Sequence, residues 1–181
     1  FPRNPPLTVS VNLSPRQFQQ PNLVEQVERT LHETGLAARS LKLEITEGTI
    51  MRDVETTAAA LSGLKHLGVQ LAVDDFGTGY SSLAYLSRLP LDILKIDRSF
   101  VRGIDRDGED TAIVRAIISM AKSMHLSVTG EGIETAEQAA LLRTWACDLG
   151  QGFYYSRPLE AASLEALLAT DGLPSGQANV A

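Results

Sequence analysis

Apolar and polar residues alternate along six short stretches of the chain, and each stretch is followed by a segment with helical periodicity. In residues 69–75, for example, Val69, Leu71 and Val73 are separated by single residues, which is the period of two of an extended strand. The predicted strands are residues 8–13, 41–46, 69–75, 92–97, 126–131 and 150–155, and the predicted helices are about residues 22–33, 53–67, 81–88, 110–124, 136–146 and 161–169. This alternation of strands and helices predicts a mainly parallel sheet with helices outside it.

Two α/β folds are built in this way, a doubly wound open sheet and a TIM-like (β/α) barrel. The first predicted strand lacks the glycine-rich turn of a dinucleotide-binding doubly wound sheet, and this favours the barrel. A complete barrel has eight strand–helix units in about 250 residues, so 181 residues with six units leave it two units short. We divide the chain into a linker at residues 1–7, a partial barrel domain at residues 8–170 and a flexible tail at residues 171–181.

The alternation also gives each predicted strand an outer and an inner face. The apolar positions, including Val9 and Val11 of the first strand, are expected to pack against the helices. The opposite face carries polar side chains at or near the carboxyl ends of five strands: Asn12, Glu44, Asp74, Lys95 and Glu131. Barrel enzymes keep their chemistry at this end, so these residues define a candidate active site.

Asp74 and Asp75 are adjacent carboxylates at the end of the third predicted strand, ahead of a loop with two glycines. Adjacent carboxylates repel, and folded proteins solvate them, hydrogen-bond them or neutralise them with a cation. On this stretch alone two interpretations stay open, a cation site and an acidic turn in which Asp75 caps the next helix. With Asn12, Glu44 and Glu131 the pair makes an all-oxygen ligand set, which favours Mg²⁺ or Mn²⁺ over Zn²⁺. Two such ions are the standard device for phosphodiester hydrolysis.

Composition narrows the class of partner. The net charge of -6 argues against a surface for a nucleic acid polymer, but not against a small anionic ligand held through metal ions. Cys147 is the only cysteine, so neither a disulfide framework nor a cysteine metal cluster is expected. No apolar run approaches the roughly 20 residues of a membrane span, and no signal peptide opens the sequence. We expect a cytoplasmic protein, or the cytoplasmic part of a larger protein that is soluble or membrane-bound.

Six motifs follow one another in the order in which the EAL domain family has them. They are Val11-Asn12-Leu13-Ser14, Leu43-Glu44-Ile45-Thr46-Glu47, Asp74-Asp75-Phe76-Gly77-Thr78-Gly79, Leu94-Lys95-Ile96-Asp97, Glu131-Gly132-Ile133-Glu134-Thr135 and Gln151-Gly152-Phe153. Over about residues 8–168 the chain therefore resembles the bacterial phosphodiesterases that hydrolyse cyclic di-GMP to the linear dinucleotide. The resemblance implies a TIM-like barrel, a two-metal site for Mg²⁺ or Mn²⁺, and inhibition by Ca²⁺.

The resemblance also implies roles for the matching residues. The metal ligands would be Asn12, Glu44, Asp74, Asp75 and Glu131. The catalytic residues would be Lys95, which orients the attacking water, Glu131, and Glu47, which steadies the loop after the central strand. Supporting positions near the metals and the substrate would be Asp97, Glu134 and Gln151. Family members often dimerise, which implies a homodimer interface in the loop and helix at residues 76–86.

The chain departs from the family pattern at its start. The Glu-Ala-Leu motif belongs on an early strand upstream of Asn12 and is absent there, while Glu165-Ala166-Leu167 lies on the last predicted helix and is a chance match. We therefore expect a domain truncated before that motif, without its first two strands, one metal-binding carboxylate and a substrate arginine, and with regulatory domains upstream in the parent protein. Such a chain alone is expected to be weakly active or inactive. The alternatives are an inactive cyclic di-GMP receptor, a protein-interaction module and, outside the family, an enolase-like lyase with Lys95 as general base.

Overall fold

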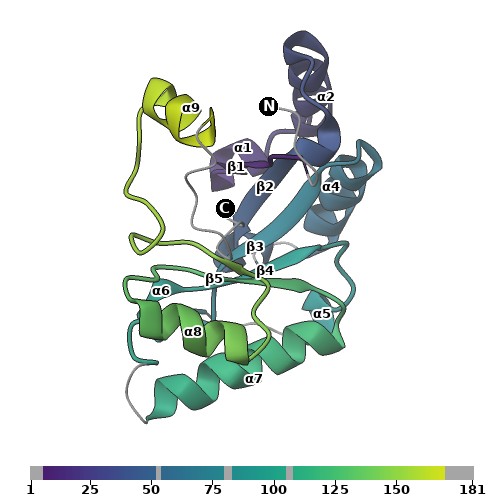
Figure 1. The fold of residues 1–181 in the computed structure, drawn as a ribbon. Helices are drawn as coiled ribbons and strands as arrows, with labels where there is room; N and C mark the ends of the chain where they lie inside the picture. Colours follow the sequence, from purple (N-terminus) through teal and green to yellow (C-terminus); the bar gives the residue numbers. More distant parts are fainter. Residues whose placement is uncertain (1–5, 52–53, 80–82, 105–107, 170–181) are drawn as a thin grey trace.

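The computed structural model describes residues 6–51, 54–79, 83–104 and 108–169. These residues form a sheet of six parallel strands: β1 (Val9–Asn12), β2 (Leu41–Thr46), β3 (Gln70–Phe76), β4 (Ile93–Ile96), β5 (Ser127–Gly130) and β6 (Leu149–Gly150). Each strand pairs with the next one in the sequence. Because the strand order never reverses, the chain winds in one direction, as in a barrel, and has no central switch point of the doubly wound type. The strands curl into a half-barrel (Figure 1), which confirms the predicted fold class.

The helices between the strands differ widely in length. The longer ones are α2 (Leu23–Thr34), α4 (Val54–His66), α7 (Glu109–Ser123), α8 (Ala136–Thr144) and α9 (Ala161–Ala169), and the short ones are α1 (Pro15–Phe18), η1 (Ala38–Ser40), α3 (Glu47–Ile50), α5 (Leu83–Leu86) and α6 (Arg98–Val101). Figure 1 shows α7 and α8 together along one side of the sheet, with α9 apart from them at the end of a long connection. The alternation pattern does not predict α3 or α6, which turn the chain directly after β2 and β4. The predicted tail at residues 171–181 lies outside the described residues, as do residues 1–5 of the predicted linker.

The last predicted strand, residues 150–155, is wrong for most of its length. β6 ends at Gly150, and the chain then turns around Ile133: the Ile133 amide donates to the Gln151 carbonyl (3.0 Å), and the Tyr154 amide donates to the Ile133 carbonyl (3.0 Å). Gly152 lies between these two bonds with φ +157°, and a Cβ there would lie 2.1 Å from the Ile133 carbonyl oxygen. Close approach of two backbones therefore replaces strand pairing.

The outer face of the sheet is apolar and buried along its centre, as the alternation predicts. Ile45, Leu71 and Leu94 are fully buried in the core. The prediction is wrong for β1, where Val9 and Val11 are 46% and 43% exposed. β1 is the edge strand and pairs only with β2 among the described strands, so its apolar side chains stay at the surface.

The amino ends of the strands are fastened twice by the same arrangement, an aspartate clamp. In the first clamp, Asp92 just before β4 accepts from the backbone amide of Leu71 in β3 (2.8 Å) and pairs with Lys65 at the end of α4 (2.6 Å). In the second, Asp148 just before β6 accepts from the amide of Val128 in β5 (2.7 Å) and pairs with Lys122 of α7 (2.5 Å). Each carboxylate ties a helix end to the start of a neighbouring strand.

We expect the hydrogen bond to the buried amide, and not the ion pair, to carry the stability of the second clamp. Asp148→Ala leaves the amide of buried Val128 without its acceptor and is expected to lower the free energy of unfolding by about 1–3 kcal/mol. Lys122→Met removes only a partly exposed ion pair and is expected to cost less than about 1 kcal/mol. Urea unfolding of both variants measures the difference, with Asp148→Asn as the control that keeps an acceptor. Equal losses for the two variants would contradict this assignment.

Candidate metal centre and active site

Lys95 gathers three carboxylates from three different strands. Its side chain is 3% exposed on β4. The ammonium lies 2.9 Å from Asp74 Oδ1 at the end of β3, 2.6 Å from Glu131 Oε1 just after β5, and in hydrogen-bonding contact with Glu44 Oε2 of β2. The structure thus brings together four of the five inward polar residues of the sequence analysis, at the carboxyl ends of the strands.

Asp75 joins this cluster because β3 contains a bulge. Pairing with β4 runs from Val73 opposite Leu94 to Phe76 opposite Ile96, so β3 has one extra residue at this point. Asp75 takes the left-handed conformation there, with φ +55°, and its amide donates to Asp74 Oδ1 (3.1 Å). Bulges re-aim side chains in this way. Adjacent residues of a regular strand would point to opposite faces.

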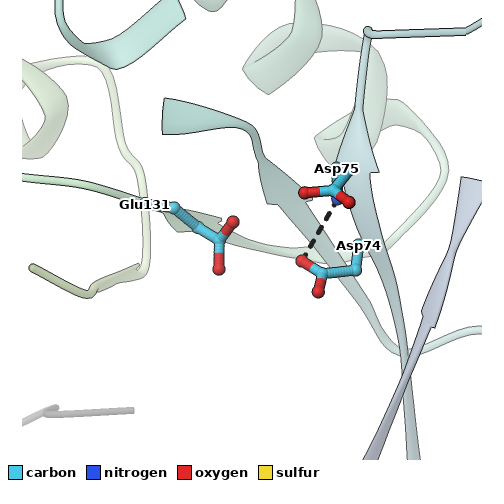
Figure 2. A group of neighbouring side chains, drawn as sticks. All are labelled: Asp74, Asp75 and Glu131. Atoms are coloured by element: carbon cyan, nitrogen blue, oxygen red, sulfur yellow. Dashed lines mark hydrogen bonds between the residues drawn. The ribbon is translucent and has the colours of Figure 1, made fainter. Parts of the chain in front are cut away.

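The bulge leaves both aspartates on the side of the sheet that Glu131 approaches. Figure 2 shows Asp74 and Asp75 together on β3, with the Glu131 side chain pointing toward them from the neighbouring segment. One carboxylate oxygen from each of the three residues lies within 4.8 Å of the others. The alternative in which Asp75 caps the next helix is wrong, because residues 77–79, which follow it closely, are not helical.

The charges of the cluster do not balance. Burial would by itself lower the pKa of Lys95, but hydrogen bonds to Glu131 and Glu44 raise it above its ordinary value. Burial raises the pKa of Glu131, with Lys95 opposing the rise, and burial followed by the charge of Asp74 raises the pKa of Asp75. A single ammonium faces more carboxylates than it can neutralise, and the site therefore favours an additional cation.

The donor atoms of the site suit a hard divalent cation. Glu44 Oε1 is buried without a hydrogen-bond partner among the described residues, while Lys95 occupies the other oxygen of the same carboxylate. Asn12, with its amide oxygen, lies directly opposite Glu44 in the β1–β2 pairing. Unpaired carboxylate oxygens and an amide oxygen in one place are the ligand set that Mg²⁺ and Mn²⁺ prefer. The residues present therefore fit the metal site that the resemblance implies.

Glu47 lies against the loop after β3. It is the first residue of α3 and is buried, and its Oε2 accepts from the backbone amide of Gly77 (2.9 Å). A Cβ at Gly79 would lie 2.9 Å from Glu47 Oε1, so the loop passes directly over this carboxylate. The described contacts end at Gly79, because residues 80–82 lie outside the described part of the chain.

The described contacts do not bring the supporting residues of the sequence analysis into the cluster. Asp97 caps α6 by accepting from the Ser99 amide (2.9 Å); burial would raise its pKa, but the hydrogen bonds from Ser99 lower it. The Glu134 carboxylate is exposed and lies 3.7 Å from Arg102. Gln151 is exposed. Within the described contacts, none of the three side chains bonds to Lys95 or to the carboxylates around it.

Two buried polar residues of the inner face escaped the sequence analysis. Lys42 lies two residues before Glu44 on β2, and burial lowers its pKa while the charge of Glu44 opposes the lowering. Thr129 is fully buried opposite Lys95 in the β4–β5 pairing, and its hydroxyl has no hydrogen-bond partner among the described residues. The signal was present in the sequence, since both share the strand parity of residues already assigned to the inner face.

The fold and the site define a parallel α/β half-barrel with an acid–lysine cluster at the carboxyl ends of its strands. The family model of the EAL domain matches residues 2–158, and the chain belongs to the EAL domain family. It is 49% identical over 162 residues to the cyclic di-GMP phosphodiesterase NbdA of Pseudomonas aeruginosa. The aligned region makes up 90% of this chain and 21% of NbdA. The chain therefore spans about a fifth of that relative.

Solved structures support the same grouping. The phosphodiesterase PaMucR in complex with c-di-GMP superposes with a TM-score of 0.84 at 43% identity, over 87% of this chain and 64% of that one. BlrP1 of Klebsiella pneumoniae, solved with c-di-GMP and either calcium or manganese, superposes with a TM-score of 0.77 at 33% identity, over 83% of this chain and 39% of that one. In the described residues of the present chain, no helix combines the length and the apolar character needed to cross a membrane.

Proposed function

We propose that this chain carries the catalytic acids and the lysine of a metal-dependent phosphodiesterase that hydrolyses cyclic di-GMP to the linear dinucleotide. The observation that carries the proposal is the Lys95 ammonium, held by carboxylates from three strands beside the adjacent carboxylate of Asp75. The names of NbdA and PaMucR supply the substrate class. The cytoplasmic location and the regulatory domains outside this chain are proposed together with that substrate.

In this proposal the acids divide into two ligand groups. Asn12, Glu44 and Asp74 would hold one cation, and Asp75 and Glu131, together with Asp74, would hold the second. When bound, the two cations would supply the Lewis acidity that activates water and stabilises charge on the phosphodiester. The unpartnered Glu44 Oε1 and the close approach of the Asp74, Asp75 and Glu131 oxygens support this division.

The remaining residues of the site position the acids, the loop after β3 and the substrate. Lys95 fixes the three acids around it with the three donors of its buried ammonium. A donor would become available to the attacking water where a bound cation takes over one of these carboxylates. Glu47 holds the loop after β3 in place through the Gly77 amide. Asp97, Glu134 and Gln151 then line the margin on the substrate side. The enolase-like alternative would instead use Lys95 as a base, which fits poorly with an ammonium whose pKa is raised.

We also propose a homodimer through residues 76–86. Leu83 and Tyr85 of α5 are 51% and 47% exposed, and the same segment continues the loop that Glu47 contacts, so subunit contact and the active site would share one structural element. Residues 80–82 of the proposed interface lie outside the described residues. Sedimentation analysis at increasing concentration tests it, and a monomer throughout would rule it out.

The assay of the proposal follows cyclic di-GMP and its linear product by chromatography in Mg²⁺, Mn²⁺ or Ca²⁺. Mg²⁺ and Mn²⁺ are expected to support turnover, and Ca²⁺ to permit binding with little turnover, because Ca²⁺ is larger and takes looser coordination geometry. The chain as printed is expected to turn over slowly or not at all. A fusion to the part of the PaMucR structure that this chain does not cover is expected to turn over faster and serves as the comparison.

The outcomes separate the candidate functions. Full activity in a chelator would overturn the two-metal proposal, and full activity in Ca²⁺ would overturn the expected preference for Mg²⁺ and Mn²⁺. Binding of cyclic di-GMP by calorimetry with no cleavage by either form would make the domain a receptor, and no binding by either form would leave the protein-interaction module. The retained acids and lysine favour the enzyme over both.

A further inference from the structure

A second lysine is buried in the half-barrel beneath the metal site. Lys42 is 2% exposed. It lies two residues before Glu44 on β2, so both side chains point to the inner face. Its neighbours in the strand pairing are Ser10 of β1 and Gln70 of β3, and neither carries a charge. Among the ion pairs of the described residues, none includes the Lys42 ammonium.

The charges that act on Lys42 belong to the active site. Glu44 attracts its ammonium from the same strand, and Lys95 repels it from β4. Glu44 therefore shares its face of the sheet with two lysines: Lys95 bonds Oε2, Lys42 lies two residues earlier on β2, and Oε1 keeps no hydrogen bond among the described residues. The other charged groups of the described cluster are Asp74 at the end of β3, Asp75 beside it and Glu131 after β5.

We infer that Lys42 is a positioning residue that sets how tightly the site holds its cations, an inference that rests on the proposed function. Without a cation, its charge offsets part of the excess negative charge of Glu44, Asp74, Asp75 and Glu131. With a cation at Glu44, the same charge repels the ion through a protein interior in which charges are weakly screened. Lys42 thus stabilises the metal-free fold and weakens metal binding.

The test measures metal binding without substrate, by titrating Mg²⁺ and Mn²⁺ into the whole chain in a calorimeter. Lys42→Met keeps the length of the side chain and removes the charge, and it is expected to tighten binding by about tenfold or more. Lys42→Arg keeps the charge and is expected to bind like the wild type. Lys122→Met makes the same change of net charge at the far end of the strands, and it is expected to leave the affinity unchanged.

Thermal unfolding gives a second readout that a merely structural lysine would not move. Lys42→Met is expected to unfold at a lower temperature than the wild type in chelator, and to gain more in Tm than the wild type when Mg²⁺ is added. A lysine that only packs would shift Tm equally in both conditions. If Lys42→Met does not fold in chelator, folding on addition of Mg²⁺ supports the inference, and Lys42→Gln repeats the comparison with a polar side chain.

The outcomes also separate this inference from the proposed function. Metal binding by the wild type with unchanged affinity in Lys42→Met and Lys42→Gln overturns the role of Lys42 and leaves the two-metal proposal standing. No metal binding by any form overturns both. Equal Tm increments on adding Mg²⁺ in the wild type and Lys42→Met overturn the inference on their own.

Discussion

Replacing Lys95 by alanine is expected to lower kcat for cyclic di-GMP hydrolysis by about 10²–10⁴-fold, the range that a positioned proton-handling group contributes. The ammonium is the only group in the described structure that contacts Glu44, Asp74 and Glu131 at once. Its loss removes the group that we propose to orient the attacking water, and it leaves three carboxylates to repel one another. KM is expected to change much less than kcat, because the substrate contacts of this proposal lie at the margin of the site.

Lys95→Ala is also expected to lower the stability of the fold, which can be measured without substrate. Removing one partner from a buried charge cluster typically costs about 3–5 kcal/mol of stability, so Lys95→Ala is expected to unfold far more readily than the wild type in chelator. Lys95→Arg keeps the charge and is expected to recover stability but not kcat, because a guanidinium has a different shape. Kinetics of the PaMucR fusion and urea unfolding of the chain measure the two effects. A large rise in KM at unchanged kcat would make Lys95 a substrate-binding residue instead.

Replacing Asp74 by asparagine is expected to weaken binding of both cations and to lower hydrolysis by at least about 10²-fold, since even residues that only support metal ligands cost 10–100-fold in affinity. Asparagine keeps an oxygen that can accept from the Asp75 amide and from Lys95, the two contacts of Asp74 Oδ1. The variant therefore removes the charge of the shared ligand and preserves its shape.

Calorimetry with Mn²⁺ and the hydrolysis assay measure the effect of Asp74→Asn. The matched control is Asp148→Asn, the same exchange at the opposite end of the strands, which is expected to leave metal affinity unchanged. Hydrolysis at the wild-type rate by the PaMucR fusion carrying Asp74→Asn would end the two-metal proposal.

The central part of the fold could be predicted from alternation alone, because each strand buries a regular apolar face. Leu71, Leu94 and their neighbours give the pattern of a sheet covered on its outer side, and the predicted strands at β2 to β5 are confirmed. The prediction fails at the ends of the sheet. Residues 151–155 alternate like a strand, yet they wrap around Ile133 through contacts that span 18 or more positions of sequence. No local pattern encodes such a contact.

Strand parity predicts the position of some residues of the candidate site but not of others. Parity alone puts Glu44, Asp74, Lys95 and Glu131 on the inner face, and the structure brings their side chains into contact. Parity puts Asp75 on the wrong face, since adjacent residues alternate, and its position next to Asp74 and the family resemblance add it to the ligands. The bulge that turns it inward depends on pairing with β4, which the sequence of β3 by itself does not reveal.

That bulge also says something about what selection has favoured in this chain. Asp75 holds a left-handed backbone, φ +55°, in which glycine would sit without strain. A carboxylate at this position is a worse choice for the backbone and places one more negative charge beside Asp74 and Glu131. Strained residues of this kind persist where the surrounding structure enforces them for a purpose. The backbone preference for glycine at position 75 therefore conflicts with the ligand role that we propose for Asp75.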